Sequence, residues 1–244
     1  MRNYNFISFR YIGIALTQLI AAPLFVSCDD LVEIDPPKTE ILDTSVFKTD
    51  ASAASALVGM YSSMITDGNV LNVGFGAGLS ADETDPANPI DFAFTNFGSN
   101  DLTSADFGAS NYWSGFYKII YQANSIIDNS KKSTGMTPEG KSKIIAEAKF
   151  TRALNYFYLV NMFGPVPLAV TSDVKTNKAL PRASEPDVYA QIISDLKDAE
   201  ADLPVDYSSY GGKRDRPNKS AASALLAKAY LYTADYANAE KKSN

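Results

Sequence analysis

Apolar residues recur at helical spacing over most of the chain from about residue 51 to residue 233. Repeats of apolar positions at i, i+3 and i+4 are typical of amphipathic α-helices. The pattern predicts helices over approximately residues 51–65, 112–129, 138–162, 185–203 and 220–233. The sequence therefore predicts a mainly α fold, in which the helices pack against one another along their apolar faces.

The third predicted helix has clear signals at both ends. Thr137 is suited to cap its first turn, and Pro138 suits the first helical position. Gly164 and Pro165 are predicted to end the helix and to turn the chain back along the bundle. A short extended segment is expected directly afterwards, over residues 166–170.

Residues 66–111 do not follow a helical pattern. Glycine, asparagine and aspartate are frequent in this segment, and no apolar period persists. These residue types favour turns and irregular backbone. We therefore predict a long irregular loop, and loops of this length in compact domains usually have a function.

Large side chains on the predicted helices are expected to pack in the core. At helical spacing, aromatic rings more often fill the space between helices than contact a ligand. Arg152 lies on the same aromatic helix, and we predict a buried, paired guanidinium that holds helices together. The aromatic residues in question are Trp113, Tyr117, Tyr156, Phe157, Tyr158 and Phe163.

The C-terminal segment resembles a tetratricopeptide repeat. Leu226, Ala227, Tyr230 and Ala239 fall at the spacings of that repeat, in which a ring fills the groove between two closely paired helices. A helix pair of this kind needs a neighbour to bury its apolar face. We therefore expect that the domain is truncated at its C-terminus or needs another chain, and that residues 29–244 alone are marginally stable.

Composition narrows the classes of function. The 244 residues include no histidine and one cysteine, and the net charge is −6. An acidic chain repels phosphates, which argues against nucleic acid as a partner. Without histidine, the chain lacks the commonest general base and metal ligand. We therefore predict a binding protein with no catalytic residues, no metal and no cofactor.

The N-terminus is typical of a secretory signal peptide. Arg2 and Arg10 precede an apolar run over residues 12–26, which is shorter than the roughly 20 residues that span a bilayer. We predict a signal peptide over residues 1–27, with an N-terminal membrane anchor as the alternative. Its removal takes two arginines and no acids, which brings the net charge from −6 to −8.

Cys28 follows the predicted cleavage position. A lone cysteine in an exported protein needs an explanation, and the sequence from Phe25 to Cys28 resembles the bacterial lipobox, in which the cysteine is lipidated. A free thiol is the alternative. The predicted organisation is a lipoprotein signal peptide over 1–27, an extended leader over 28–48 and a helical domain over 49–244.

Short motifs follow one another in order along most of the predicted mature chain. They are Ser27-Cys28-Asp29-Asp30, Asp35-Pro36-Pro37, Ala56-Leu57-x-Gly59-Met60-Tyr61, Ala81-Asp82-Glu83, Trp113-x3-Tyr117-x2-Ile120-x3-Asn124, Glu147-Ala148-Lys149-Phe150-x-Arg152, Tyr156-Phe157-x-Leu159-Val160-x2-Phe163-Gly164, Val188-Tyr189-x2-Ile192-x2-Asp195-Leu196 and Ala222-x-Ala224-Leu225-Leu226. In this order and spacing they resemble the SusD/RagB family of nutrient-binding lipoproteins of Bacteroidetes.

The resemblance implies a SusD-like helical fold with tetratricopeptide-type helix pairs and long irregular loops. It implies a lipid-anchored protein of the outer membrane, facing the cell exterior, that captures glycans and delivers them to a SusC-type TonB-dependent transporter. Members of the family are longer than this chain, which matches their N-terminal half. A peptide-binding member of the family is the alternative, and a secreted glycoside hydrolase or a protein-interaction scaffold would be a different class.

The loop over residues 66–111 is the expected place for ligand contacts. Rings can stack on the apolar face of a sugar, while amides and carboxylates bind its hydroxyl groups. The predicted ligand-binding residues are Asp82, Phe92, Phe94, Asn96, Phe97 and Asn100.

Asp82 also belongs to a small acidic cluster with Glu83 and Asp85. Four interpretations stay open for this cluster. It could line the ligand site, bind calcium, supply the paired carboxylates of a glycosidase, or form a solvated turn before Pro86.

Overall fold

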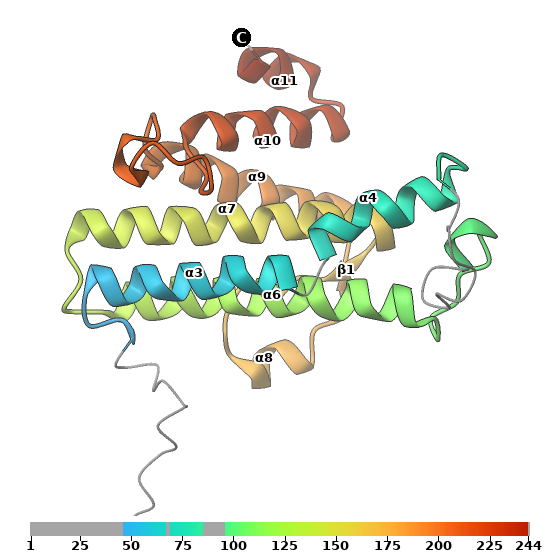
Figure 1. Ribbon diagram of the computed structural model, residues 1–244, viewed down its shortest axis with the longest axis horizontal. Helices are drawn as coiled ribbons and strands as arrows, with labels where there is room; N and C mark the ends of the chain where they lie inside the picture. The colour runs from blue at the N-terminus through green and yellow to red at the C-terminus, as the bar shows by residue number, and fades with distance from the viewer. Residues whose placement is uncertain (1–45, 67–68, 85–95, 244) are drawn as a thin grey trace, which may run out of the picture. The chain divides into compact units, whose positions relative to one another are not determined.

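The computed structural model describes residues 46–66, 69–84 and 96–243 (Figure 1). The predicted signal peptide, the lipidation residue Cys28, most of the leader, and Phe92 and Phe94 lie outside these residues. The described elements are α3 (Asp50–Thr66), α4 (Asn69–Ser80), α6 (Phe107–Lys132), α7 (Pro138–Phe163), β1 (Val166–Pro167), α8 (Val174–Lys178), β2 (Arg182–Ala183), α9 (Glu185–Asp202), the 3-10 turn η3 (Ser208–Tyr210), α10 (Lys219–Tyr232) and α11 (Tyr236–Ser243).

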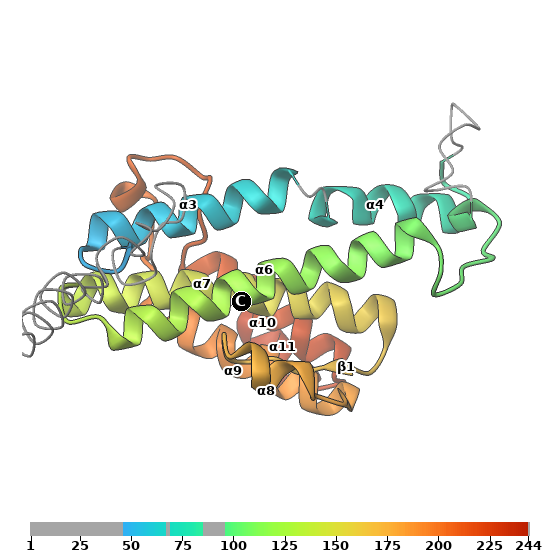
Figure 2. The ribbon, with the colours of Figure 1, turned by 90° about the horizontal axis from the view of Figure 1, so that it is seen from below.

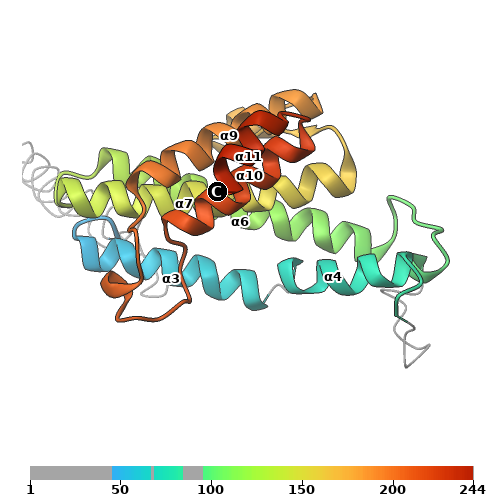
Figure 3. The ribbon, with the colours of Figure 1, turned by 90° about the horizontal axis from the view of Figure 1, so that it is seen from above.

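The long helices α6 and α7 form an antiparallel pair at the centre of the fold (Figure 1). Helices α3 and α4 follow one another along one side of this pair, while α9, α10 and α11 pack on the other side (Figures 2 and 3). The mainly α fold predicted from the apolar pattern is therefore confirmed. Its only described sheet is the two-stranded antiparallel ribbon of β1 and β2.

Helix α7 begins and ends where its sequence signals predict. The hydroxyl of Thr137 accepts a hydrogen bond from the backbone N–H of Gly140 at 3.0 Å, and Pro138 is the first helical residue. Gly164 has a φ of +66°, and its N–H donates to the carbonyl of Val160 at 2.9 Å. A positive φ favours glycine because it has no Cβ, so Gly164 ends the helix as predicted.

Helix α9 begins at residues with the spacing of a capping box. Ser184 and Asp187 have the spacing of this motif, and the Ser184 hydroxyl accepts from the Asp187 N–H at 3.3 Å. The helix ends at Leu203, whose N–H donates to the Ala199 carbonyl at 2.9 Å. Both ends agree with the boundaries expected from the sequence.

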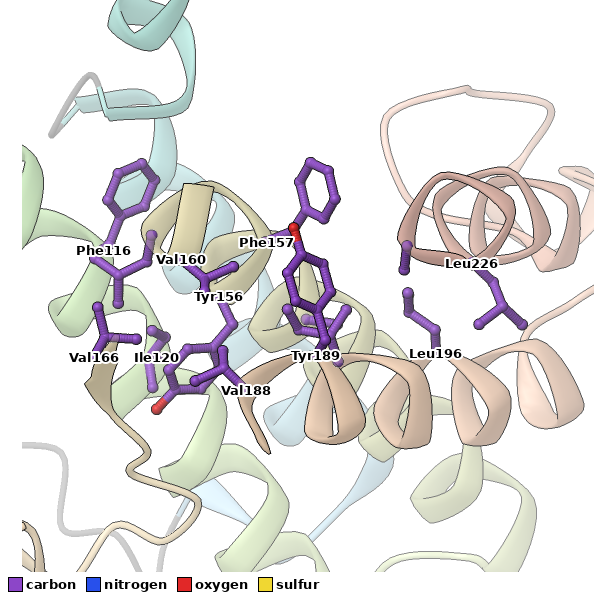
Figure 4. Close-up of a cluster of buried hydrophobic side chains, with 14 of the residues drawn as sticks. Phe116, Ile120, Tyr156, Phe157, Val160, Val166, Val188, Tyr189, Leu196 and Leu226 are labelled. Carbon is purple, nitrogen blue, oxygen red and sulfur yellow. The ribbon is translucent and has the colours of Figure 1, made fainter. Parts of the chain in front are cut away.

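The main apolar core forms where α6, α7, β1, α9 and α10 meet (Figure 4). Tyr156 is fully buried there, and its hydroxyl donates to the Ala169 carbonyl at 2.9 Å and accepts from the Ala169 N–H at 2.7 Å. Phe157 is also buried. These rings are core residues, as predicted, and Tyr156 additionally fixes the segment that follows β1.

Arg152 is the centre of a buried polar network. Its Nε and Nη2 donate to the two carboxylate oxygens of Asp195 at 2.8 and 2.7 Å. Its Nη1 donates to Asn124 Oδ1 at 2.7 Å and to the Val170 carbonyl at 3.1 Å. The network joins α6, α7, α9 and the segment after β1, so the predicted buried and paired guanidinium is confirmed.

Glu147 forms a second buried network that the sequence analysis did not predict. Its fully buried carboxylate accepts from the hydroxyls of Tyr61 and Tyr210, both at 3.0 Å. It also accepts from Arg216 Nε at 2.8 Å and Nη2 at 2.7 Å. Burial and the Glu147 carboxylate raise the pKa of both tyrosines above the usual value. The network ties α3 and the segment before α10 to α7.

The prediction of one irregular loop over residues 66–111 is wrong in part. Residues Asn69–Ser80 form α4, and α6 begins at Phe107. Glycine weakens a helix in isolation, but Gly76 permits a close packing contact here. A Cβ at Gly76 would lie 2.9 Å from the Tyr112 hydroxyl and 3.4 Å from the Phe97 ring. Tertiary packing therefore outweighs the low helix propensity of this segment.

The C-terminal pair α10 and α11 has the contact expected of a tetratricopeptide-type unit. Tyr230 and Ala239, which matched the repeat spacing, are both buried where the two helices meet. Leu231 and Tyr232 remain exposed at the end of α10, at 54% and 53%.

Candidate ligand-binding site

A hollow of about 510 Å³ opens between the beginning of α6, the end of α7 and β2. We call it the Trp113 hollow. Its volume lies in the range typical of small-molecule sites, roughly 300–1,000 Å³. The lining residues are Leu102, Thr103, Ser104, Ala109, Ser110, Trp113, Met162, Phe163 and Arg182.

Aromatic rings form the apolar wall of the Trp113 hollow. The Trp113 ring packs edge-to-face against Phe163, with centroids 5.2 Å apart and an interplanar angle of 89°. It also contacts the Tyr117 ring at 5.1 Å. Trp113 and Phe163 are only partly buried, because the hollow leaves part of each ring uncovered. They therefore belong both to the core, as predicted, and to the wall of a site.

Arg182 supplies a cation at the rim. Its guanidinium carbon lies 4.9 Å from the centre of the Trp113 ring, and its Nη1 donates to the Pro165 carbonyl at 2.6 Å. Residue 182 is also the register partner of Pro167 in the β1–β2 ribbon. Stacking on a ring and a hydrogen bond to backbone both orient the guanidinium. Within the described residues, no carboxylate forms an ion pair with it.

The loop before α6 forms the opposite rim. The Asp106 carboxylate accepts hydrogen bonds from the Thr103 N–H, from the Thr103 hydroxyl at 2.8 Å and from the Asn96 side-chain amide. The bonds from Thr103 and then Asn96 lower the pKa of Asp106. These three hydrogen bonds to Asp106 fix the loop that carries Thr103 into the lining.

Two of the predicted ligand-binding residues lie close to this loop. Asn96 does not line the hollow, but its bond to Asp106 helps to position the rim. Phe97 is 5% exposed, and its ring packs edge-on against Tyr112 with centroids 5.7 Å apart. The structure thus places Phe97 among the packing residues, because α4 covers it.

The other two described candidates lie near the end of α4. Asn100 is exposed, has a φ of +53°, and donates from its side chain to the Ser80 carbonyl at 3.0 Å. Asp82 is exposed in the turn after α4, with a φ of +58°. Neither lines the Trp113 hollow, and both have the positive φ that asparagine and aspartate tolerate in turns.

A second hollow of about 280 Å³ lies between α6 and α8. We call it the Tyr121 hollow, after a ring that is 47% exposed at its mouth. Tyr117 lines it as well, and its hydroxyl donates to the Pro167 carbonyl at 2.7 Å. Burial raises the pKa of Tyr117 above its usual value, while Arg182 acts in the opposite direction. The remaining lining residues are Ile120, Asn124, Ala169, Val174, Asn177 and Lys178.

The comparison with known proteins identifies the family. The SusD-like family model, described as "Starch-binding associating with outer membrane", matches residues 37–231. This chain belongs to the SusD-like family.

Relatives and solved structures agree with this assignment. A SusD-like protein of Bacteroides ovatus is 31% identical over 237 residues, which are 96% of this chain and 41% of the relative. The SusD-like protein P2 of Formosa agariphila is 30% identical, over 93% of this chain and 45% of the relative. A laminarin-binding SusD-like protein of solved structure superposes with a TM-score of 0.69 at 28% identity, over 80% of this chain and 43% of that one. The SusD-like chain thus spans about two fifths of the length of these proteins.

Sequence reasoning did not find the two hollows of this SusD-like chain. Trp113, Tyr117 and Tyr121 are spaced four residues apart, which places three rings along one face of α6. The segment from Lys175 to Arg182 carries three basic residues and no acidic residue. Together, these two patterns could have indicated the site.

The described part of the SusD-like chain has neither a cluster of metal-binding side chains nor a membrane-spanning helix. Among the described residues, no group of three or more acidic, cysteine or histidine side chains could hold a metal ion. In the same part of the chain, no helix is long and apolar enough to cross a membrane.

Proposed function

We propose that this SusD-like chain binds a glycan at the Trp113 hollow. The observation that carries the proposal is an open, sugar-sized hollow with an aromatic wall, hydroxyl groups and an oriented cation. Such a mixture of apolar surface and few polar groups is typical of small-ligand sites. The family description and the laminarin-binding neighbour also support carbohydrate as the ligand class.

The lining suggests how a sugar ring would be held. The uncovered parts of Trp113 and Phe163 offer apolar surface to C–H groups, and Ser104 and Ser110 offer hydroxyls to the sugar's own hydroxyl groups. Arg182 donates hydrogen bonds from the rim. Binding of this kind needs no reacting group, which agrees with a protein that captures its ligand without changing it.

The family and the N-terminal sequence support a proposal for the cellular role. Lipidation at Cys28 would anchor the protein at the outer membrane, with the helical domain facing the cell exterior. We propose that the bound glycan is then delivered to a SusC-type TonB-dependent transporter. Durable anchoring by such a lipidated cysteine requires more than one acyl chain.

A bulky substitution in the lining tests the site without removing any packing. Ser110 is exposed on α6 and lines the Trp113 hollow, whereas its neighbour Asn111 is exposed and does not. Ser110→Trp should fill the hollow, and Asn111→Trp is the matched control. Retention of each variant in native gels cast with laminarin, starch, polygalacturonate or dextran sulfate measures binding.

At least one of these polysaccharides should retard the unchanged chain and the Asn111→Trp variant. Ser110→Trp should weaken that retention at least about tenfold, which corresponds to about 1.4 kcal/mol of binding free energy. Equal retention of both variants would place the site elsewhere. No retention by any polysaccharide, together with binding of peptides from a protein digest, would favour the peptide-binding alternative.

A further inference from the structure

The lining of the Trp113 hollow contains a cationic side chain and no anionic one within the described residues. Among the described residues that form it, none has a carboxylate or amide side chain. Its polar groups are three hydroxyls and the guanidinium of Arg182, and the hydroxyl of Thr103 already donates to Asp106. The hydroxyls can both donate to and accept from sugar hydroxyl groups. The guanidinium can in addition bind a ligand that carries an anionic group.

Arg182 has donors to spare for such a ligand. A guanidinium carries five N–H donors in a rigid fork and accepts no hydrogen bond. One nitrogen of Arg182 donates to the Pro165 carbonyl, and no other bond of this guanidinium is seen within the described chain. The fork fits a carboxylate or sulfate with two parallel hydrogen bonds. Stacking on Trp113 holds it in place before the ligand arrives.

The Tyr121 hollow also has a cation, Lys178, among its lining residues, together with the amide side chains of Asn124 and Asn177. The ammonium-bearing side chain of Lys178 is exposed at its edge, and no described carboxylate forms an ion pair with it. The side-chain nitrogen of Asn124 donates to the carbonyls of Ala169 and Thr171, at 2.9 and 3.1 Å. No acidic side chain lines this hollow within the described residues.

The two hollows are neighbours along one face of α6. Tyr117 lines the second hollow and contacts Trp113, which lines the first. Pro167, in the second hollow, is the register partner of Arg182, in the first. Eight residues of α-helix, from Trp113 to Tyr121, advance about 12 Å. A ligand that contacts both rings is therefore longer than one sugar ring.

We infer that the two hollows form one groove for an acidic glycan, whose carboxylate or sulfate groups bind Arg182 and Lys178 while its sugar rings lie along Trp113, Tyr117 and Tyr121. The inference rests on the proposed function and names its substrate class. The predicted mature chain has a net charge of −8, so the protein as a whole repels anions. Binding of an acidic glycan must then depend on these two cations rather than on the overall charge.

Two matched pairs of polysaccharides test the inference. Polygalacturonate is compared with its carboxyl-reduced form, and dextran sulfate with dextran, so that each pair shares a backbone and differs in charge. Calorimetry measures binding by the unchanged chain, Arg182→Gln and Lys178→Gln. Lys175→Gln is the control, because Lys175 is an exposed cation of α8 that lines neither hollow.

The acidic member of at least one pair should bind about tenfold more tightly than its neutral partner, and its affinity should fall as salt is added. Arg182→Gln and Lys178→Gln should each reduce that affinity about tenfold, and Lys175→Gln should leave it within about twofold. Lys178 is exposed, so its variant keeps the test valid if Arg182→Gln disturbs the fold.

Three results would overturn the inference, and they separate it from the proposed function. If the neutral polysaccharides bind as tightly as the acidic ones or more tightly, and Ser110→Trp abolishes this binding, the proposed glycan site stands but the inference of an acidic ligand is rejected. An equal loss of affinity in Lys175→Gln would mean that general surface charge, rather than the groove, binds the polymer. No binding of any polysaccharide would reject the proposed function together with the inference.

Discussion

Removing the carboxylate of Asp195 would leave a buried guanidinium without its ion-pair partner. Arg152 is 4% exposed and Asp195 is 1% exposed, and two hydrogen bonds of 2.8 and 2.7 Å join them. The Nη1 group would keep its bonds to Asn124 and Val170. The charge, however, would have no compensation in a region that excludes water. We therefore expect Asp195→Ala to be strongly destabilising.

The magnitude follows from the burial of both groups. Breaking a buried ion pair by removing one partner costs about 3–5 kcal/mol, whereas the whole domain is stable by only about 5–15 kcal/mol. Replacing both residues, in Arg152→Met with Asp195→Ala, removes the two charges together. That double variant still leaves Asn124 Oδ1 and the Val170 carbonyl without their donor, at about 1–3 kcal/mol for the buried Asn124 oxygen and less for the part-buried carbonyl.

Urea unfolding followed by far-ultraviolet circular dichroism measures these effects. Asp195→Ala, Arg152→Met and a variant with both of these changes complete a double-mutant cycle. The variant with both changes should lose at least about 1 kcal/mol less than the sum of the single losses, because each single variant leaves one buried charge without its partner, whereas the double variant leaves none. A loss below about 1 kcal/mol in Asp195→Ala would refute the assignment of Arg152 as a charge that depends on this partner.

Three further predictions concern other parts of the chain. Gly135→Ala should lower the free energy of unfolding by about 1–3 kcal/mol, because the new Cβ would lie 2.2 Å from the Lys48 carbonyl oxygen. A Cβ at Gly59 would meet no atom within 4 Å, so Gly59→Ala should raise the melting temperature through its higher helix propensity. Asp128 is desolvated in part, which raises its pKa, but hydrogen bonds from Ser172 and Thr171 outweigh this and lower it. A carboxylate with a lowered pKa stabilises the fold at a pH above its unfolded-state pKa, and this stabilisation is lost as the pH falls through its folded-state pKa. The melting-temperature difference between the unchanged chain and Asp128→Asn should therefore shrink from about pH 6 to about pH 3. A difference that stays constant over this range would contradict the prediction. Cys28→Ala should move the protein from membrane to soluble fractions in cell fractionation, and unchanged membrane retention would refute lipidation.

Local interactions explain why the sequence alone determines most of the helical fold. The apolar period determines which face of each helix is buried. The residues that begin and end a helix lie close to its ends in the chain. Thr137 and Gly164 act within one turn of α7, so their effect does not depend on distant partners. The buried pairing of Arg152 was also predictable, because a charge on an aromatic helix face can be buried only with a partner.

Tertiary structure alone determined α4 and the two hollows. Helix α4 contains glycines that weaken a helix, and its contacts with Phe97 and Tyr112 come from segments further along the chain. The apolar period shows that Trp113 faces other helices, but it does not show how completely they cover its ring. That depends on where α7 ends and where the β1–β2 ribbon places Arg182. A hollow is space that distant segments leave unfilled, so the pattern of one helix does not determine whether that space exists.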